Sequence, residues 1–204
     1  MPTDVPSPID LRLPHDAREW EQSAMSKRPW RTEFFAQFAS EIAASPLKIK
    51  RVLELGSGPG FLAEHLLCSL GHVEYVLLDF SAPMNDLAKA RLGELETRAT
   101  FIERSFKKEN WASGLGSFEC VVTNQAVHEL RHKRYAETLH RQVRKVLAPG
   151  GTYLVCDHFA GEGGMKNEAL YMSVAEQRQT LLAAGFKSVR QVMAKGGLAL
   201  HHAV

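Results

Sequence analysis

The sequence predicts an α/β protein: a seven-stranded, doubly wound sheet that is mostly parallel, with its last strand antiparallel, plus an N-terminal helical cap. After Pro46, short apolar runs alternate with amphipathic stretches of helical period, as in parallel strands joined by right-handed crossover helices. Only Gly196 and Gly197 separate the last two apolar runs, which is too short for a crossover and predicts an antiparallel hairpin. A length of 204 residues, 45% hydrophobic and 24% charged, fits one globular domain.

The first 46 residues are expected to form an irregular arm followed by the helical cap. Four prolines among the first fourteen residues disfavour regular structure there. The pattern is helical from Asp16 to Ala44, with a break at Pro29. Apolar residues recur at every fourth position of its second half: Trp30, Phe34, Phe38 and Ile42. We therefore divide the chain into an arm and cap, 1–46, and a ligand-binding domain, 47–204.

Strands and helices alternate from residue 51 onward. Strands are expected at 51–55, 75–79, 100–103, 120–124 and 152–157, and helices at 61–70, 83–95 and 133–147. Ser173 and Glu176 have the spacing of a capping box, so a further helix should run from 173 to 184 and end at Gly185. The terminal hairpin, around residues 189–200, completes seven strands.

A glycine loop joins the first strand to the first helix. Gly56, Gly58 and Gly60 allow a sharp turn and let a ligand approach the backbone beside the positive end of the helix. The dinucleotide fingerprint requires glycine at its sixth position, where this chain has Phe61. The loop therefore favours a nucleoside ligand other than a nicotinamide dinucleotide, and the alternative of an oxidoreductase is disfavoured.

Asp79 ends the second strand, nineteen residues after Gly60. Because neighbouring parallel strands open onto one crevice, its carboxylate is placed to accept hydrogen bonds from both hydroxyls of a ribose. The alternative is an aspartate that caps the following helix, a role for which Ser81 competes.

From about Lys50 to the C-terminus, the chain resembles the class I S-adenosylmethionine-dependent methyltransferases. The reversed last strand also matches that family. The matching motifs are ELGSGPG at 54–60, LDFS at 78–81, ECVVTNQAVHEL at 119–130, VRKVLAPGGTYLVCD at 143–157 and LLAAGF at 181–186. Because the five motifs occur in the family's order, the resemblance implies this fold and S-adenosyl-L-methionine as the cofactor.

The resemblance also implies the cofactor-binding residues. The loop would bracket the methionine part of the cofactor, Asp79 would hold the ribose, and Asn124 and Gln125 would line the sulfonium. The predicted cofactor contacts are Arg31, Glu54, Gly56, Ser57, Gly58, Gly60, Asp79, Phe80, Ser105, Phe106, Asn124 and Gln125.

Three of these contacts have alternatives. The family usually carries an aspartate for the adenine amino group after the third strand; here Ser105 stands in its place and offers a weaker hydrogen bond. Phe80 and Phe106 are placed to sandwich the adenine, and a core position is the equal alternative for Phe106. Arg31 is placed for the cofactor carboxylate, with a surface arginine as the alternative.

Methyl transfer is an in-line displacement, for which the protein supplies positioning and, where the acceptor carries a proton, a base. His128 and His158 follow the fourth and fifth strands, and histidine has a suitable pKa for a base near neutrality. We predict that both are catalytic. Glu129 and Asp157 lie beside them and are weaker candidates.

Both acids have structural alternatives, and a metal site is a further possibility. For Glu129 the alternative is an ion pair with Arg131 or Lys133, and for Asp157 it is the acceptance of backbone hydrogen bonds at a loop start. Two histidines with two acids permit a metal, as in methyltransferases that chelate catechols. The chain lacks the aspartate-rich motifs of that group, so we predict no metal.

Composition limits the partners and the compartment. A net charge of +2 without a basic stripe predicts no nucleic-acid partner. No run is long enough for a membrane span and the N-terminus does not read as a signal peptide, so we expect no membrane partner and a cytoplasmic location. Cys68, Cys120 and Cys156 lie in apolar runs and are expected to be buried thiols. The oligomeric state, monomer or homodimer, is left open.

These features predict a methyltransferase that modifies a small-molecule acceptor at oxygen, nitrogen or carbon. The segment NQAV, 124–127, lacks the NPPY-like string that base- and amide-methylating enzymes use. Specificity is expected from the cap, with Trp20, Trp30, Arg31 and Phe34, and from the loop at 159–172, whose glycines would suit a mobile lid. Ordinary packing is the favoured alternative for Trp30 and Phe34. The alternative is a non-catalytic cofactor-binding or scaffold protein with the same fold.

Overall fold

A computed structural model describes residues 3–204, which form one seven-stranded sheet in the order β3-β2-β1-β4-β5-β7-β6. The strands are β1 Arg51–Leu55, β2 Glu74–Asp79, β3 Ala99–Glu103, β4 Phe118–Asn124, β5 Leu147–His158, β6 Val189–Lys195 and β7 Leu198–Ala203. β7 runs antiparallel to both of its neighbours, β5 and β6, and the other pairs are parallel. The predicted sheet is confirmed, including its single reversed strand.

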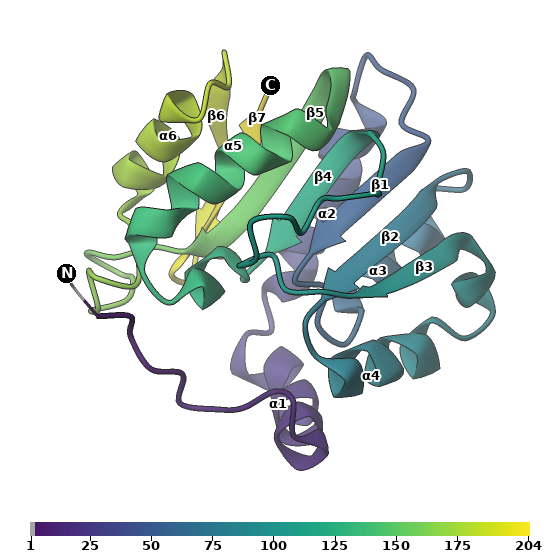
Figure 1. The fold of residues 1–204 in the computed structure, drawn as a ribbon, viewed down its shortest axis with the longest axis horizontal. Coiled ribbons are helices and arrows are strands. Elements are labelled where there is room, and N and C mark those ends of the chain that lie inside the picture. Colours follow the sequence, from purple (N-terminus) through teal and green to yellow (C-terminus); the bar gives the residue numbers. More distant parts are fainter. Residues whose placement is uncertain (1–2) are drawn as a thin grey trace.

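Helices cover both faces of the sheet (Figure 1). They are α1 Pro14–Lys27, α2 Arg31–Ala43, α3 Phe61–Ser69, α4 Ala82–Leu92, α5 Ala136–Val146 and α6 Val174–Ala183, with 3-10 turns η1 Gly93–Arg98, η2 Val127–Leu130 and η3 Lys133–Tyr135. Alternate strand residues point to opposite faces. Val121 and Tyr153 therefore join the apolar layer under α5 and α6, whereas Val122 and Leu154 join the layer under α2 and α3.

The predicted elements are present, with shifts at some boundaries. The helix expected at 133–147 is the 3-10 turn η3 followed by α5, and β5 begins at Leu147 instead of residue 152. Its early start reflects pairing of Leu147 with Phe118 across the sheet. The capping box of Ser173 and Glu176 is formed, as predicted, and starts α6.

The helical cap is held against the sheet at two places. Phe34 and Phe38 of α2 are buried in the same apolar layer as α3. The Trp30 ring lies against the β6–β7 turn, where a Cβ on Gly196 would be 2.3 Å from the ring. Gly196 has φ +55°, so the turn needs glycine for both its backbone and its space. The division at residue 46 stays a prediction.

The prediction of three buried thiols is wrong for Cys68. Cys120 and Cys156 are buried, but Cys68 is exposed. The inward face of α3 is formed by residues at helical spacing, including Leu62 and Leu66. Cys68 lies two residues past Leu66, which puts it on the outer side of the helix.

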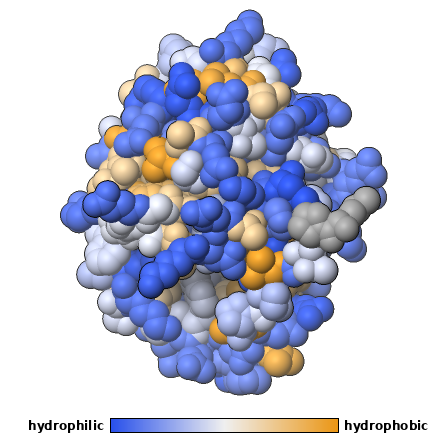
Figure 2. All heavy atoms as spheres, turned by 90° about the vertical axis from the view of Figure 1, so that its left-hand side faces the viewer, coloured by the Kyte–Doolittle hydropathy of each residue, from blue (hydrophilic) through white to orange (hydrophobic). Residues whose placement is uncertain are grey.

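The surface offers little continuous apolar area. The side of the molecule shown in Figure 2 is mostly hydrophilic, with small separate apolar patches. Among residues 3–204, the large apolar side chains that are exposed are Leu13, Tyr135 and Val204. Within the same residues, no helix is both long enough and apolar enough to cross a membrane.

Candidate functional site

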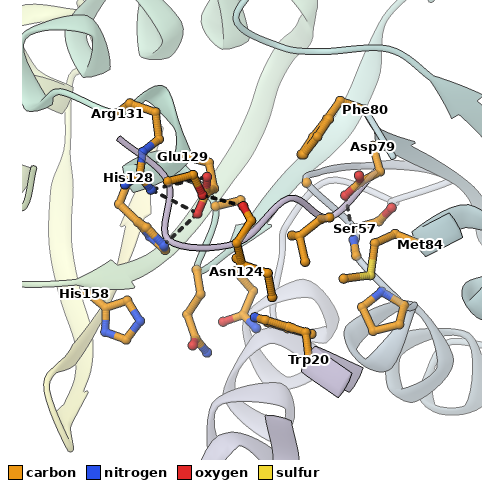
Figure 3. A pocket seen from close by; sticks show the side chains of 18 of the residues that line it. Trp20, Ser57, Asp79, Phe80, Met84, Asn124, His128, Glu129, Arg131 and His158 are labelled. Atoms are coloured by element: carbon orange, nitrogen blue, oxygen red, sulfur yellow. Dashed lines mark hydrogen bonds and ion pairs between the residues drawn. The ribbon is translucent and has the colours of Figure 1, made fainter. Parts of the chain in front are cut away.

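A cavity of about 670 Å³ lies at the carboxyl ends of the central strands, within the usual size range of small-molecule sites. Its walls come from the glycine loop, the ends of β2, β4 and β5, the N-terminal arm, the helical cap and the loop 159–172. All of the predicted site residues line it except Gly60 and Ser105. Figure 3 shows side chains from these separate elements facing the same space.

The three loop glycines have positive φ angles of +67°, +53° and +78°, in chain order. A Cβ on Gly56 would lie 2.4 Å from the Cβ of Ala126, so the loop packs tightly there. A Cβ on Gly58 would meet nothing within 4 Å, which leaves its backbone open to the cavity. Gly60 precedes α3 and approaches Ala88 of α4 instead of lining the cavity. Gly60 therefore serves helix packing.

Asp79 fixes the glycine loop to the end of β2. One carboxylate oxygen accepts a hydrogen bond from the Gly58 N–H at 2.8 Å, and the other accepts from the Ser81 N–H at 2.9 Å. Burial raises the pKa of Asp79, although these backbone hydrogen bonds oppose the shift. Ser81 is the residue that caps α4, since its hydroxyl accepts from Met84 N–H. The alternative of a helix-capping Asp79 therefore does not hold.

Glu54 brings a buried carboxyl to the floor of the cavity. The hydroxyl of Tyr75 donates to this carboxyl at 2.9 Å, and Glu54 is 2% exposed. Burial raises the pKa of Glu54 to about 8. The carboxyl therefore holds its proton at neutral pH unless a cation lies beside it.

Several polar atoms of the cavity wall are buried without a hydrogen-bond partner. They are Arg31 Nε, Ser57 Oγ, Asn124 Oδ1, Gln125 Nε2 and His158 Nδ1. Buried polar atoms in proteins are nearly always paired. Their concentration around one cavity indicates a ligand with several polar groups.

The predicted adenine contacts are only partly brought together. Phe80 and the 7% exposed Phe106 both line the cavity, and Phe106 also packs in the core. Ser105 does not line it, and its hydroxyl accepts from the Lys107 N–H at 3.3 Å. Met84 of α4 also lines the cavity, near Asp79 (Figure 3), and was not predicted from the sequence.

His128 is held between two carboxylates. Its Nδ1 is 2.6 Å from Asp157, which also accepts the backbone N–H of His128 at 2.7 Å, and its Nε2 is 3.4 Å from Glu129. Burial alone would lower the pKa of His128, but the charge of Asp157 and the hydrogen bonds to both carboxylates raise it to about 10. His128 is therefore protonated at neutral pH.

His158 lies beside His128 and has the opposite electrostatics. The two ring centroids are 5.2 Å apart, and Tyr171 packs against both rings. Burial lowers the pKa of His158 to about 4; the nearby Asp157 opposes this shift, and the charge of His128 adds to it. His158 is therefore neutral at physiological pH, with an unpaired Nδ1.

Arg131 ties the N-terminal arm across the cavity. Its side chain donates to the carbonyl oxygens of Val5 and Pro6 at 2.9 and 2.6 Å, and its own carbonyl accepts from Val5 N–H at 2.8 Å. It also pairs with Glu129, as one of the sequence alternatives expected. The arm crosses the site from Arg131 toward Asp79 (Figure 3), a placement that sequence reasoning missed.

The other alternative for Asp157, the acceptance of backbone hydrogen bonds, is confirmed. Besides His128 N–H, it accepts from His158 N–H at 2.8 Å. In the part of the chain described, no three His, Cys, Asp or Glu side chains gather in a way that could hold a metal ion.

The comparisons with known proteins agree with this geometry. The profile of a family described as "Methyltransferase domain" matches residues 52–151, the segment from the start of β1 into β5. The chain has the fold of the class I methyltransferases. A comparison with curated protein sequences gave no significant match.

Solved structures of methyltransferases share the fold of this domain. An O-methyltransferase family protein from Burkholderia thailandensis is 17% identical, with a TM-score of 0.72, over 93% of this chain and 59% of its own. The DhpI–SAH complex is 20% identical, with a TM-score of 0.72, over 95% of each chain. The glycopeptide N-methyltransferase MtfA is 19% identical, with a TM-score of 0.68, over 85% of this chain and 89% of its own. At these identities, the likeness establishes the methyltransferase fold.

Proposed function

We propose that this chain is an S-adenosylmethionine-dependent methyltransferase that acts on a small-molecule acceptor at oxygen, nitrogen or carbon. The observation that carries the proposal is the set of buried, unpaired polar atoms around one cavity of the methyltransferase domain. The DhpI complex, whose chain is matched over 95% of its length, contains SAH, the product form of this cofactor.

The residues present fit the cofactor. The open backbone at Gly58 would receive the methionine part, the ribose hydroxyls would donate to Asp79, and Phe80 and Phe106 would flank the adenine. Glu54 would face the amino group, whose charge would return its carboxyl to the ionised form. When bound, S-adenosylmethionine supplies a methyl group already activated on a sulfonium. The protein then has to orient the acceptor and exclude water.

We infer different roles for the two histidines. His158 is neutral with an unpaired Nδ1, so it can take the proton that the acceptor loses as its bond to the methyl group forms. His128 has no free acceptor nitrogen while both of its nitrogens face carboxylates. His128 and Asp157 are positioning residues that join the 3-10 turn after β4 to the end of β5, where His158 lies.

The size of the acceptor, the absence of a nucleic-acid partner, the location and the domain division are also proposals. The near-neutral charge of +2 supports a small acceptor and no nucleic-acid partner. A cytoplasmic location stays a prediction from the sequence, as does the division of the chain at residue 46. The non-catalytic alternative would bind the cofactor and transfer no methyl group.

Calorimetric titration of the full chain with S-adenosylhomocysteine tests the cofactor assignment. We expect binding by the wild type and a loss of about 10- to 100-fold in affinity for Asp79→Asn, which removes charge-assisted hydrogen bonds to the ribose. Asp86→Asn, on the exposed side of α4, is the matched control and should bind like the wild type. Absence of binding by the wild type would refute the proposal.

Turnover separates the enzyme from the non-catalytic alternative. Release of S-adenosylhomocysteine is measured over a panel of small acids, phenols, amines and amides. Turnover on at least one acceptor is the expected result. Cofactor binding without turnover on any acceptor would favour the scaffold.

A further inference from the structure

Two arginines project from the turn between α1 and α2 into the cavity wall. Arg28 precedes Pro29, which forces it out of the helical region, to φ −142° and ψ 75°. The Arg28 carbonyl accepts from the Arg31 N–H at 3.1 Å. Trp30, packed over Gly196, fixes the same turn to the sheet. The two guanidinium groups are thus carried by a rigid turn.

Neither arginine has an acidic partner among residues 3–204. Arg31 is 4% exposed; one of its terminal nitrogens donates to Gln125 at 2.9 Å, its Nε is unpaired, and its guanidinium lies 5.3 Å from the Trp20 ring. Burial lowers the pKa of Arg31 to about 10, and the charge of Arg28 adds to the shift. Both groups remain charged at neutral pH, so the turn holds two uncompensated positive charges.

The acids of the cavity are already engaged elsewhere. Glu54 accepts from the Tyr75 hydroxyl, Glu129 pairs with Arg131, and Asp79 accepts the backbone of the glycine loop. Buried charge without a counter-charge is costly. This cost applies to the buried Arg31, which calls for an anion from a bound ligand, whereas the half-buried Arg28 presents an unpaired guanidinium to the same cavity.

The cofactor can satisfy only one of them. S-adenosylmethionine has a single carboxylate, and its amino and sulfonium groups add positive charge to the cavity. A guanidinium binds one planar oxyanion through two parallel hydrogen bonds. Once Arg31 is matched with the cofactor carboxylate, Arg28 is left for a second oxyanion.

We propose that the methyl acceptor carries an oxyanion, a carboxylate or a phosphate, that is bound by Arg28. This inference rests on the proposed methyltransferase function. Arg28, His158 and Tyr171 line the same cavity, so an anion bound by Arg28 would share that cavity with the proposed base. Trp20, Phe35 and Leu170 give the same cavity apolar wall, which suits an acceptor with an apolar body.

Calorimetry on the full chain saturated with S-adenosylhomocysteine tests the inference. The probes are phenylacetate, phenyl phosphate and the neutral phenylacetamide, each titrated to tens of millimolar. The variants are Arg28→Gln and, as the matched control, Arg18→Gln on the exposed side of α1. Each variant is first titrated with S-adenosylhomocysteine alone, and the probes are also titrated without it.

We expect at least one anionic probe to bind the wild type about tenfold more tightly than the amide, and the preferred anion identifies carboxylate or phosphate. Arg28→Gln should remove that preference, a loss of about 10- to 100-fold, and should keep its affinity for S-adenosylhomocysteine. Arg18→Gln should behave like the wild type. Equal affinity for anions and amide, no binding of either anion, or an unchanged preference in Arg28→Gln would overturn the inference. Failure of S-adenosylhomocysteine to bind would instead refute the proposed function. The probe titrations without S-adenosylhomocysteine would then still show whether Arg28 binds an anion.

Discussion

Replacement of Asp157 by asparagine should lower the pKa of His128 and change how stability depends on pH. In the wild type, the carboxylate of Asp157 and that of Glu129 hold the His128 proton, and the pKa is about 10 against an ordinary value of 6.5. The other groups facing the ring are neutral His158 and Tyr171, which do not replace that charge. In Asp157→Asn, burial prevails over the weaker Glu129 contact, so the pKa should return toward 6.5.

The sign of the stability effect follows from linkage. Because the pKa of His128 is higher in the folded chain than in the unfolded chain, its stabilisation is complete below pH 6.5 and is lost as the pH rises through 10. Between pH 7 and pH 9 this predicts a decrease in the free energy of unfolding of at most about 2 to 3 kcal/mol. The variant should lack the part of the decrease that comes from His128, because its histidine is largely neutral across the same range. The raised pKa of Glu54, about 8, adds a further decrease that the wild type and the variant share, so the difference between the two proteins measures His128.

Two measurements check the prediction. Nuclear magnetic resonance titration of histidine-labelled protein gives the pKa of His128 directly in the wild type, so the test survives if Asp157→Asn fails to fold. Urea unfolding at pH 7 and pH 9 gives the stability change, with Glu129→Gln as a control that should lower the pKa less. A wild-type His128 that titrates at or below 6.5, or equal unfolding free energies at the two pH values, would contradict the reasoning.

Three further predictions follow from the site. His158→Gln should lower kcat by about 100- to 10,000-fold with unchanged affinity for S-adenosylhomocysteine, and an unchanged kcat would rule out its role as base. Arg131→Gln should release the N-terminal arm and speed its cleavage in limited proteolysis; wild-type cleavage rates would show that Arg131 does not hold the arm. Gly56→Ala should destabilise the chain by about 1 to 3 kcal/mol more than Gly58→Ala, because both have positive φ but only Gly56 has a Cβ position 2.4 Å from a neighbouring carbon. Equal urea-unfolding free energies for the two variants would contradict the steric argument.

The fold could be predicted because its signals are local in the sequence. Apolar runs of strand length, the helical spacing between them and the two-residue turn at Gly196 each determine structure within a few residues. The same holds for the capping box at Ser173 and for the glycine loop after β1. Strand ends then place Asp79 and Asn124 on one edge, because the carboxyl ends of parallel strands meet there.

The walls added to this edge depend on contacts distant in the sequence. Val5 and Arg131 are 126 residues apart in the sequence and are joined by backbone and side-chain hydrogen bonds. No residue pattern near Val5 predicts that contact. For Ser105 the sequence predicted a cavity contact that the structure does not have. Its position after β3 matched the family pattern, but the hydroxyl accepts a local backbone N–H and leaves the cavity wall to Phe106.

The two histidines show why residue type and strand position could not assign the base. Both follow neighbouring parallel strands, so the sequence presents them as equivalent. The structure separates them through one carboxylate: Asp157 binds the ring of His128 but only the backbone N–H of His158. The ring of His128 gains a charged partner and a pKa of about 10. The ring of His158 is buried beside that positive charge and has a pKa of about 4. Neighbouring titratable groups whose pKa values are driven apart in this way typically divide positioning and proton transfer between them, and here the unpaired nitrogen belongs to the neutral ring.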